Sequence, residues 1–354
     1  MHAFMTGRNA LNRNKSSEYC AFLVDFGAGS DGHRGQYNAM LAELFALRRD
    51  PMGLRTLFTR GAVLVPQIEA APLRFVLTSL VRAMLDLRTV GLLLRPLPTL
   101  HGKTLRLRAK RAALSILRRL PSVRVLTIIP FAAEPGQDRI AHGWIHDLQW
   151  WDQGLGCAAD PVVASQTARS LREAAGSRLI CCAIGGQNRA KGFDRFAGFW
   201  AASHELREAM LFAFAGKTSG DVTAAVRQFR QSSGFAIDRF ASDAELAGFY
   251  DAADLIWCAY HPDYDQASGV LGRAFQTGVP AAVRAGSVAE RLCRLAAHPH
   301  LSLDEVSAPE DLLDLPGRRD HSAVQALVRE YREHSLAVLA EALGITAADG
   351  QVKA

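Results

Sequence analysis

The feature that most constrains this 354-residue chain is the regular alternation of short apolar runs with helical patterns in its second half. Runs of this kind are typical of strands that are buried on both faces of a sheet. Alternation over about 120 residues predicts a parallel sheet with helices on both faces, because parallel strands need a crossover connection. The predicted strands are Arg178–Ile184, Ala209–Ala215, Ala236–Phe240, Asp254–Tyr260 and Val279–Val283.

The first half shows a similar alternation less regularly. Its first predicted strand, Cys20–Phe26, runs into a cluster of glycines. Further strands are predicted at Leu54–Phe58, Val123–Pro130 and Pro161–Ala164, and helices at about 72–88, 104–119 and 165–175. We therefore expect an α/β protein built from two doubly wound, Rossmann-like domains.

The boundary between the two domains is predicted near Gly176, where a helical pattern ends and a new strand begins. Residues 1–18 are polar and aperiodic, and we expect a flexible tail there. This places the first domain at 19–176 and the second at 177–320. Residues 321–354 contain a long amphipathic helix that could pack across both domains.

Charge is spread unevenly along the chain. The formal net charge is +6, yet residues 71–124 contain twelve Lys and Arg and a single acid, Asp86. Two amphipathic helices are predicted in this segment, with the basic residues on their polar side. A solvated surface, a nucleic-acid patch and a membrane-surface element would all have this composition. Nucleic-acid binding is disfavoured because Phe75 is the segment's only aromatic residue. We favour an anionic membrane surface as the partner.

Cysteine usage and hydropathy bear on the compartment. The six cysteines form no C-x-x-C pair, and most lie in apolar runs, which favours buried thiols in a reducing cytosol. The N-terminus lacks the apolar core of a signal peptide, and no stretch is apolar for long enough to span a membrane. We expect a cytoplasmic protein, with peripheral binding to the inner face of the plasma membrane left open.

A glycine-rich loop, Asp25–Tyr37, follows the first predicted strand. Its candidate ligand-binding residues are Gly29, Gly32, His33 and Gln36, because a loop at the carboxyl end of a strand and before a helix favours anions or sugar hydroxyls. A flexible connection is the alternative. The spacing of Gly27, Gly29 and Gly32 also matches a dinucleotide fingerprint, but no acidic residue ends the next predicted strand to bind a ribose.

A second candidate segment, Ile129–Gly154, is a long loop rich in His, Asp and Trp. His142 and His146 are four residues apart and Asp147 follows, so a His/Asp base near a sugar acceptor is one interpretation. Metal binding is another, although no third ligand is evident. A structural loop with aromatic residues on its surface is the third, and its tryptophans suit either stacking on sugar rings or core packing.

Two further segments follow strands of the second half. In Ala183–Phe199 a strand ends at Gly185 and Gly186, and Arg189 and Lys191 precede a helix, where they could neutralise a diphosphate. In Tyr260–Ser287 the residues Ser268 and Gly269 open a helix that stops at Gly278. Asp263 and Asp265 form a D-x-D pattern, which can bind a divalent metal but is frequent by chance.

Taken in order, several motifs of the second half resemble family 4 of the GT-B glycosyltransferases, which build bacterial polysaccharides and glycolipids. The order runs from G-G and K-G-F-D to F-A-G-K, then R-F-x-S-D-x-E-L with Y-x-A-A-D, and finally G-V-P and R-A-G-S. Together the motifs cover residues 178–292. The resemblance implies two Rossmann-like domains facing a central cleft, with the acceptor on the first domain and a nucleotide-sugar on the second.

The resemblance also implies roles for individual residues. Lys191, with Arg189 as a substitute partner, would neutralise the donor diphosphate. The helix start at Ser268, Gly269 and Val270 would bind its phosphates, so neither a metal nor a cofactor is required. The remaining expected roles are donor binding by Gly185, Gly186 and Arg273, acceptor binding by Gly29, Gly32, His33 and Gln36, and catalysis by Asp265. Catalysis by His142 and His146 is expected from the composition of their loop and not from the resemblance.

Two departures from the family pattern stand out. Gly186 occupies the position where the family has an arginine five residues before the lysine. Asp265 and Arg273 occupy the positions of the family's two glutamates, the second of which holds the donor ribose. We expect Arg273 to contact a phosphate instead.

The function expected from the resemblance is metal-independent transfer of a sugar, with retention of configuration, from a nucleotide-sugar to a glycan or lipid-linked acceptor. A non-catalytic GT-B scaffold of a membrane-associated polysaccharide assembly complex is the alternative, favoured by the cation at residue 273. A dinucleotide-dependent enzyme is the third possibility. No nucleic acid is expected as a partner.

Overall fold

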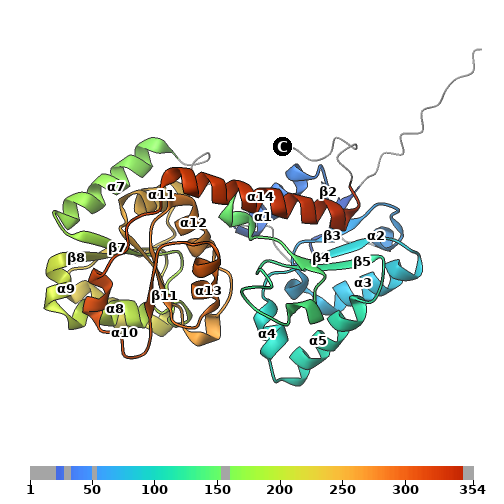
Figure 1. The fold of residues 1–354 in the computed structure, drawn as a ribbon, viewed down its shortest axis with the longest axis horizontal. Helices are drawn as coiled ribbons and strands as arrows, with labels where there is room; N and C mark the ends of the chain where they lie inside the picture. The colour runs from blue at the N-terminus through green and yellow to red at the C-terminus, as the bar shows by residue number, and fades with distance from the viewer. Residues whose placement is uncertain (1–20, 28–32, 50–53, 153–159, 346–354) are drawn as a thin grey trace, which may run out of the picture.

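The computed structural model describes residues 21–27, 33–49, 54–152 and 160–345, and it contains two six-stranded sheets (Figure 1). Every strand pairing is parallel, as predicted. The first sheet has the order β2 (Arg48–Arg49), β1 (Phe22–Leu23), β3 (Val63–Val65), β4 (Thr89–Leu93), β5 (Val123–Thr127), β6 (Gly143–Trp144). The second has the order β12 (His300–Leu303), β11 (Ala281–Arg284), β10 (Leu255–Cys258), β7 (Leu179–Ile184), β8 (Met210–Ala215), β9 (Phe235–Ile237).

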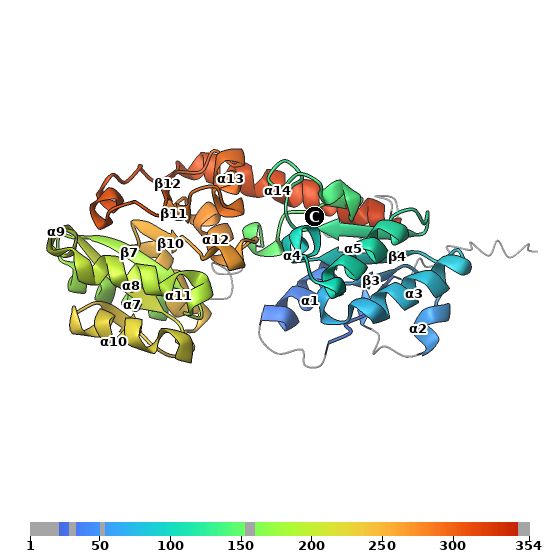
Figure 2. The same cartoon turned by 90° about the horizontal axis from the view of Figure 1, so that it is seen from below.

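Helices cover both sheets (Figures 1 and 2). Those before the second sheet are α1 (His33–Leu44), α2 (Leu54–Phe58), α3 (Pro72–Met84), α4 (Pro96–His101), α5 (Leu105–Leu117) and α7 (Pro161–Ala175). Those that follow are α8 (Phe193–Ala202), α9 (His204–Ala209), α10 (Thr223–Gln231), α11 (Asp243–Ala252), α12 (Gly269–Thr277), α13 (Val288–Leu295) and α14 (His321–Leu343). The α/β fold with two doubly wound sheets is therefore confirmed. The predicted tail 1–18 and residues 346–354 lie outside the described residues.

The central strands are buried along their whole length, which is why the sequence shows them as continuous apolar runs. Every residue of β4 and β8 is buried. In the second domain the rings of Phe196, Phe212 and Phe229 pack closely between the sheet and its helices. Four cysteines are buried free thiols, as expected: Cys181, Cys182, Cys258 and Cys293. Cys20 and Cys157 lie outside the described residues.

Two predicted strands are wrong. Leu54–Phe58 forms the short helix α2, and Pro161–Ala164 forms the first turn of α7. The Asp160 side chain caps α7 by accepting hydrogen bonds from the N–H groups of Val162 (2.9 Å) and Val163 (3.4 Å), and Pro161 suits the first helical position. Apolar runs of four or five residues have too few turns for their periodicity to separate a strand from a helix.

Helix α7 packs with the second sheet although it precedes Gly176. It lies against α11, and it meets this helix at Gly248, where a Cβ atom would come 2.5 Å from the carbonyl oxygen of Ala164. By its contacts α7 belongs to the second domain, so the boundary falls before α7 and not at Gly176. A helix cannot be assigned to a sheet from its own sequence when both neighbouring sheets offer an apolar face.

Helix α14 runs across both domains (Figure 1). It contacts β4 and β6 of the first domain and α12 of the second. The Ser335 hydroxyl accepts a hydrogen bond from the His146 N–H (3.0 Å), and Arg88 donates to the Glu341 carbonyl (3.1 Å). Among the described residues, no helix is long and apolar enough to cross a membrane.

We expect Gly248→Ala to destabilise the protein, because the added Cβ would collide with backbone atoms of α7, which can move only if the whole helix shifts. The loss should be about 1–3 kcal/mol. Gly198→Ala in α8 is the matched control, since nothing lies within 4 Å of its Cβ position, and alanine should stabilise that helix by up to about 1 kcal/mol. Thermal unfolding followed by circular dichroism measures both. Equal unfolding temperatures for the two variants would contradict the proposed close packing of α7 on α11.

Candidate active site

Three glycines bring the carboxyl ends of β7, β8 and β10 into close contact. Gly185, Gly192 and Gly216 all have positive φ angles. A Cβ atom on Gly216 would lie 2.0 Å from the Gly185 carbonyl oxygen, and one on Gly192 would lie 2.3 Å from the Ala259 carbonyl oxygen. Only glycine combines this backbone conformation with such close approach. The loops after these strands therefore form one compact edge.

Lys191 is held at this edge by a short 3₁₀ helix, Arg189–Lys191. The Asn188 side chain caps the helix by accepting the Lys191 N–H (2.9 Å), and the Lys191 ammonium nitrogen lies 3.1 Å from the Cβ position of Gly185. The side chain is partly buried, and burial lowers its pKa below the ordinary value. No carboxylate pairs with it among the described residues. A desolvated cation without a partner is the electrostatic requirement for binding an anion.

Gly186 and Arg189 are exposed on the same loop. The backbone N–H of Arg189 donates to Asp221 (3.1 Å), which holds the loop and leaves the guanidinium at the surface. Donor binding by these two residues stays a prediction.

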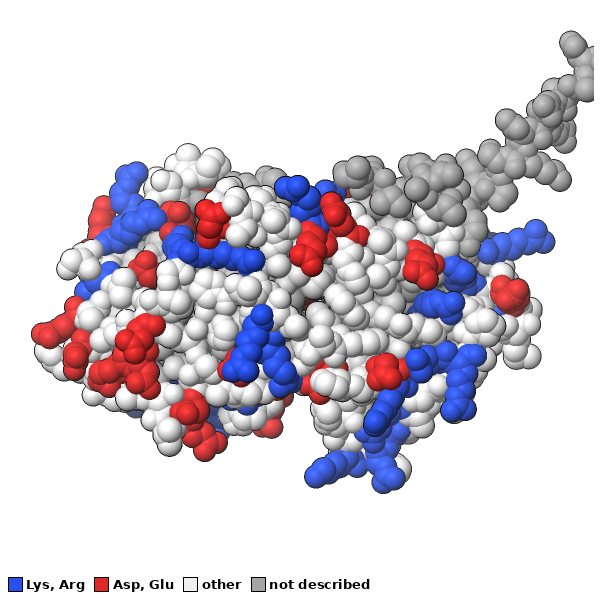
Figure 3. Space-filling view, viewed as in Figure 1, with Lys and Arg blue, Asp and Glu red and all other residues white. Residues whose placement is uncertain are grey.

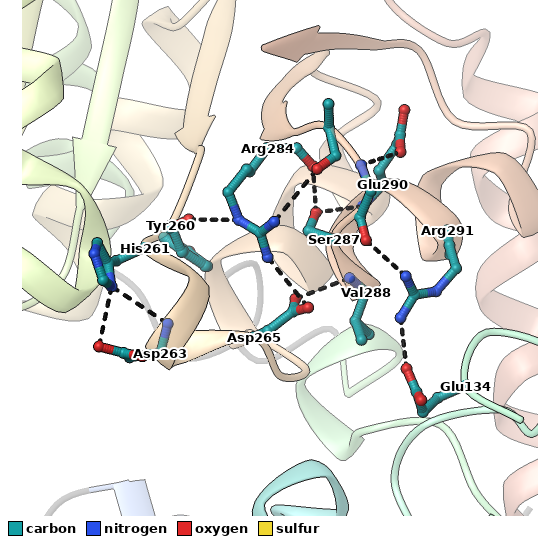
Figure 4. Close-up of polar contacts among 12 residues, drawn as sticks. Glu134, Tyr260, His261, Asp263, Asp265, Arg284, Ser287, Val288, Glu290 and Arg291 are labelled. Atoms are coloured by element: carbon teal, nitrogen blue, oxygen red, sulfur yellow. Dashed lines mark hydrogen bonds and ion pairs between the residues drawn. The ribbon is translucent and has the colours of Figure 1, made fainter. Parts of the chain in front are cut away.

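The loop after β10 lies beside the same 3₁₀ helix. The His261 N–H donates to the carbonyl of Ala190 (3.0 Å), and the His261 Nδ1 atom lies 3.3 Å from the Asp263 carboxylate (Figure 4). Sequence reasoning did not single out His261. The available signal was its position directly after a buried strand, next to Tyr260.

Asp265 does not point into open space. Its carboxylate pairs with Arg284 (3.2 Å) and accepts the N–H of Val288 at the start of α13 (2.8 Å), as Figure 4 shows. With both oxygens engaged, Asp265 holds its loop against β11 and α13, so the predicted catalytic role does not fit the structure. Asp263 and Asp265 also have different partners and do not converge on a metal position. The described residues contain no group of three or more side chains arranged as metal ligands.

The start of α12 is partly covered. The Ser268 hydroxyl accepts the Val270 N–H (3.2 Å) and lies 2.8 Å from the Tyr260 hydroxyl. Gln149 packs over Gly269, where a Cβ atom would fall 1.8 Å from its Oε1 atom. The Val270 N–H is therefore occupied in this structure, which differs from the phosphate contact predicted for Ser268, Gly269 and Val270.

Arg273 contacts the segment between the two domains and not a phosphate position. Its guanidinium forms a two-point ion pair with Asp152, with Nη2 and Oδ2 2.8 Å apart, and also donates to Gln276 (2.8 Å). Both members of the pair are largely buried. The expectation that Arg273 contacts a phosphate is wrong, because the two terminal nitrogens of its guanidinium already donate to the two carboxylate oxygens of Asp152.

His142 and His146 are also misassigned as catalytic bases. The His142 Nδ1 accepts the Val125 N–H (3.0 Å), and its Nε2 lies 3.0 Å from the Arg118 carbonyl, so backbone groups occupy both ring nitrogens. His146 is buried beneath α14, with its ring stacked 3.5 Å from that of Tyr331. Burial, followed by the nearby His334, lowers the pKa of His146 to about 3. Both histidines stabilise the loop, as the third interpretation expected, but Trp150 and Trp151 are buried and do not lie on its surface.

The acceptor residues of the first domain are only partly described. Gly29 and Gly32 lie outside the described residues, and of His33 only its place at the start of α1 is described. Gln36 is exposed on the first turn of α1, where it remains a predicted acceptor contact.

Sequence reasoning missed the polar bridge between the domains. Arg291 of α13 pairs with Glu134 of the loop after β5 (2.5 Å; Figure 4). His101 contacts the same carboxylate (2.8 Å). Within the described residues, Arg291 makes every polar contact between the body of the first domain, 21–141, and that of the second, 177–320. Figure 3 shows a notch between the two domains on the lower side of the view.

Comparison with known proteins supports the fold assignment. No family model matches the sequence. No curated protein matches it either. Among solved structures, a UDP-forming trehalose-phosphate synthase from Burkholderia vietnamiensis has a TM-score of 0.58 at 10% identity, covering 93% of this chain and 99% of that one. Sucrose-phosphate synthase from Thermosynechococcus elongatus has a TM-score of 0.55 at 12% identity, with 92% and 96% covered.

A second trehalose-phosphate synthase, from Burkholderia xenovorans, has a TM-score of 0.56 at 11% identity, with 88% and 79% covered. These proteins are glycosyltransferases, and the chain shares their two-sheet fold over almost its full length. The fold is that of GT-B glycosyltransferases. At such low identity the likeness defines the fold, and the resemblance to family 4 remains a prediction from the motifs.

We expect acid to destabilise the protein partly through His146. Its pKa in the folded state, about 3, lies below the ordinary value of 6.5. The unfolded chain therefore binds a proton that the folded chain excludes, and stability falls as the pH drops below 6.5 until about 3. Between pH 7 and pH 5 this loss amounts to about 2 kcal/mol. Urea unfolding measures the decrease in unfolding free energy between pH 7 and pH 5. For His146→Phe this decrease should be smaller by that amount, whereas the exposed control His204→Ala should behave like the unmodified protein.

The bridge through Arg291 should restrict separation of the domains. Arg291→Ala removes the polar contacts that the described residues make between the two bodies, so we expect a larger radius of gyration by small-angle X-ray scattering. Arg294→Ala is the matched control, because Arg294 pairs with Glu290 of its own helix. An unchanged radius for Arg291→Ala would show that the segment between the domains and α14 alone fix their distance.

Proposed function

We propose that this protein is a glycosyltransferase that moves a sugar from a nucleotide-sugar to a glycan or lipid-linked acceptor. The single observation that carries the proposal is Lys191, a partly buried ammonium group without an anionic partner among the described residues. It lies where the carboxyl ends of three parallel strands meet, which is where open α/β sheets bind their ligands. The GT-B fold supports the proposal, since the solved structures that share it include a sucrose-phosphate synthase and a UDP-forming trehalose-phosphate synthase.

Charge neutralisation is the chemical role proposed for this edge. When the bond between the sugar and the nucleotide breaks, negative charge develops on the departing diphosphate. Lys191 is preorganised to receive that charge, and the exposed Arg189 is close enough in the chain to add a second cation. We propose that these groups replace a metal ion. Retention of configuration is proposed from the resemblance to family 4 alone.

His261 is the candidate for contact with the transferred sugar. Its backbone is bound to Ala190 of the Lys191 turn, and its ring is half exposed beside the edge. Asp263 lies 3.3 Å from the ring and can orient it. With Asp265 engaged in a structural ion pair, His261 is the better placed residue of this loop.

A non-catalytic scaffold remains the second candidate, and the contacts of α12 favour it. Arg273 stands where the family has a ribose-binding glutamate. Both terminal nitrogens of its guanidinium donate to Asp152, which turns the side chain away from a ligand. Calorimetric titration with UDP and GDP separates the two functions. A glycosyltransferase should bind at least one of them, whereas a scaffold need bind neither.

We further propose that the protein works in bacterial polysaccharide or glycolipid synthesis, in the cytoplasm and at the inner face of the plasma membrane. The basic segment 71–124 supports this location. A lipid-linked acceptor would be presented at such a surface.

Lys191→Ala should lower sugar transfer by about 10²–10³-fold, because the developing charge loses its nearest cation. Release of the nucleotide from a panel of nucleotide-sugars measures the effect. Arg227→Ala is the control, since Arg227 is an exposed cation on α10. Thermal unfolding should be unchanged in both variants, and near-normal transfer by Lys191→Ala would refute the assignment.

A further inference from the structure

Helix α3 exposes an apolar stripe. Leu73, Leu77, Leu80 and Met84 have exposed fractions of 70%, 54%, 38% and 87%. Their spacing of four, three and four residues places them on one face of the helix. Leu85, just past the helix end, is exposed as well, as is Phe58 of the neighbouring α2. Single exposed apolar residues are ordinary in proteins, but a continuous row of them on one helix indicates a binding surface.

The prediction placed the basic residues of α3 on the solvent side, which holds for the exposed Arg74 and is wrong for Arg82. Arg82 is completely buried, and its guanidinium donates to the carbonyl oxygens of Thr56 (2.7 Å), Gly61 (2.7 Å) and Arg88 (3.0 Å). Burial lowers the pKa of Arg82 to about 10. Arg82 thus holds the loops before β3 and β4 and contributes nothing to the surface charge.

The neighbouring helix α5 supplies the positive charge. It packs beside α3 on the same face of the first sheet (Figures 1 and 2). Arg106, Arg108 and Arg119 are exposed along or just after it, together with Lys103 before it. Figure 3 shows Lys and Arg side chains gathered on the lower part of the first domain. Two apolar side chains, Leu105 and Ile116, are exposed between them.

We propose that α3 and α5 form one face that docks on an anionic lipid bilayer. The apolar stripe of α3 enters the boundary between headgroups and acyl chains, while the cations of α5 contact lipid phosphates. An apolar row flanked by cations is the pattern of elements that lie in the membrane interface. Charge also argues against an ordinary protein partner, because the only acid within 71–124 is Asp86, and protein interfaces are depleted of charge at their core.

The docking face deepens the proposed function, because it specifies how the protein contacts the membrane. Lipid binding itself does not require sugar transfer, and only the reason for docking rests on the proposed function. Helix α4 begins right after β4, at the sheet edge that carries the Glu134 bridge, and leads directly into α5. The docking face therefore adjoins the interdomain notch, where a lipid-linked acceptor could reach the edge without leaving the bilayer.

The test is cosedimentation with vesicles of phosphatidylglycerol and phosphatidylcholine, at low and at high salt, without any sugar donor. Screening removes electrostatic attraction but not apolar insertion. We expect the unmodified protein to bind at low salt and to keep a bound fraction at high salt. Leu73→Ser/Leu77→Ser/Met84→Ser should lose that salt-resistant fraction, with affinity reduced by about ten-fold or more. Arg106→Gln/Arg108→Gln should bind the vesicles with an affinity that is about five-fold lower per removed charge, and only at low salt.

Phe240→Ser/Val306→Ser is the matched control, because both residues are highly exposed and belong to the second domain. It should bind like the unmodified protein, and all variants should unfold at the same temperature. Binding by the triple serine variant equal to that of the unmodified protein at high salt would overturn the proposal. Complete release of the unmodified protein by salt would also overturn it. So would a triple serine variant that still binds the vesicles but no longer self-associates, because the stripe would then contact a second copy of the chain. Lys191→Ala should still sediment, so a failure of lipid binding and a failure of transfer are distinguishable.

Discussion

The arrangement of the two sheets depends on how the segment between them packs into the second domain. The ring of Trp150 fills the space that a side chain on residue 272 would need, since a Cβ atom on Gly272 would lie 1.9 Å from it. The indole N–H of Trp150 donates to the Ser268 carbonyl (3.2 Å), and the Arg273–Asp152 ion pair lies close by. Helix α14 then covers His146 and completes this seam.

This seam explains most differences between the predicted site and the structure. Residues that looked available for chemistry in a long polar loop, such as His146, are buried by the packing of Trp150 and Tyr331. Arg273, which replaces an acid of the family, has its own acid in Asp152. The change at residue 273 is thus half of a pair, and its role is to join α12 to the segment between the domains.

Three cations in the interior and at the domain edges serve different purposes. Arg82 is buried and binds backbone carbonyls, Arg291 bridges the two domains, and Lys191 has no anionic partner among the described residues. Only the last is electrostatically prepared for a ligand. Residue type alone could not separate these roles, because each depends on which carboxylates and carbonyls lie within a few ångströms.

The sequence by itself determined the two parallel sheets, the run of motifs between residues 178 and 292 and the position of Lys191 after a glycine-ended strand. These features are local, because periodicity, glycine and the order of strand and helix act over a few residues. Only the tertiary structure decided that α7 packs in the second domain, that His142 and His146 are structural, and that α3 faces solvent with leucines. Each of these outcomes depends on contacts between residues far apart in the chain, and such contacts have no local signature in the sequence.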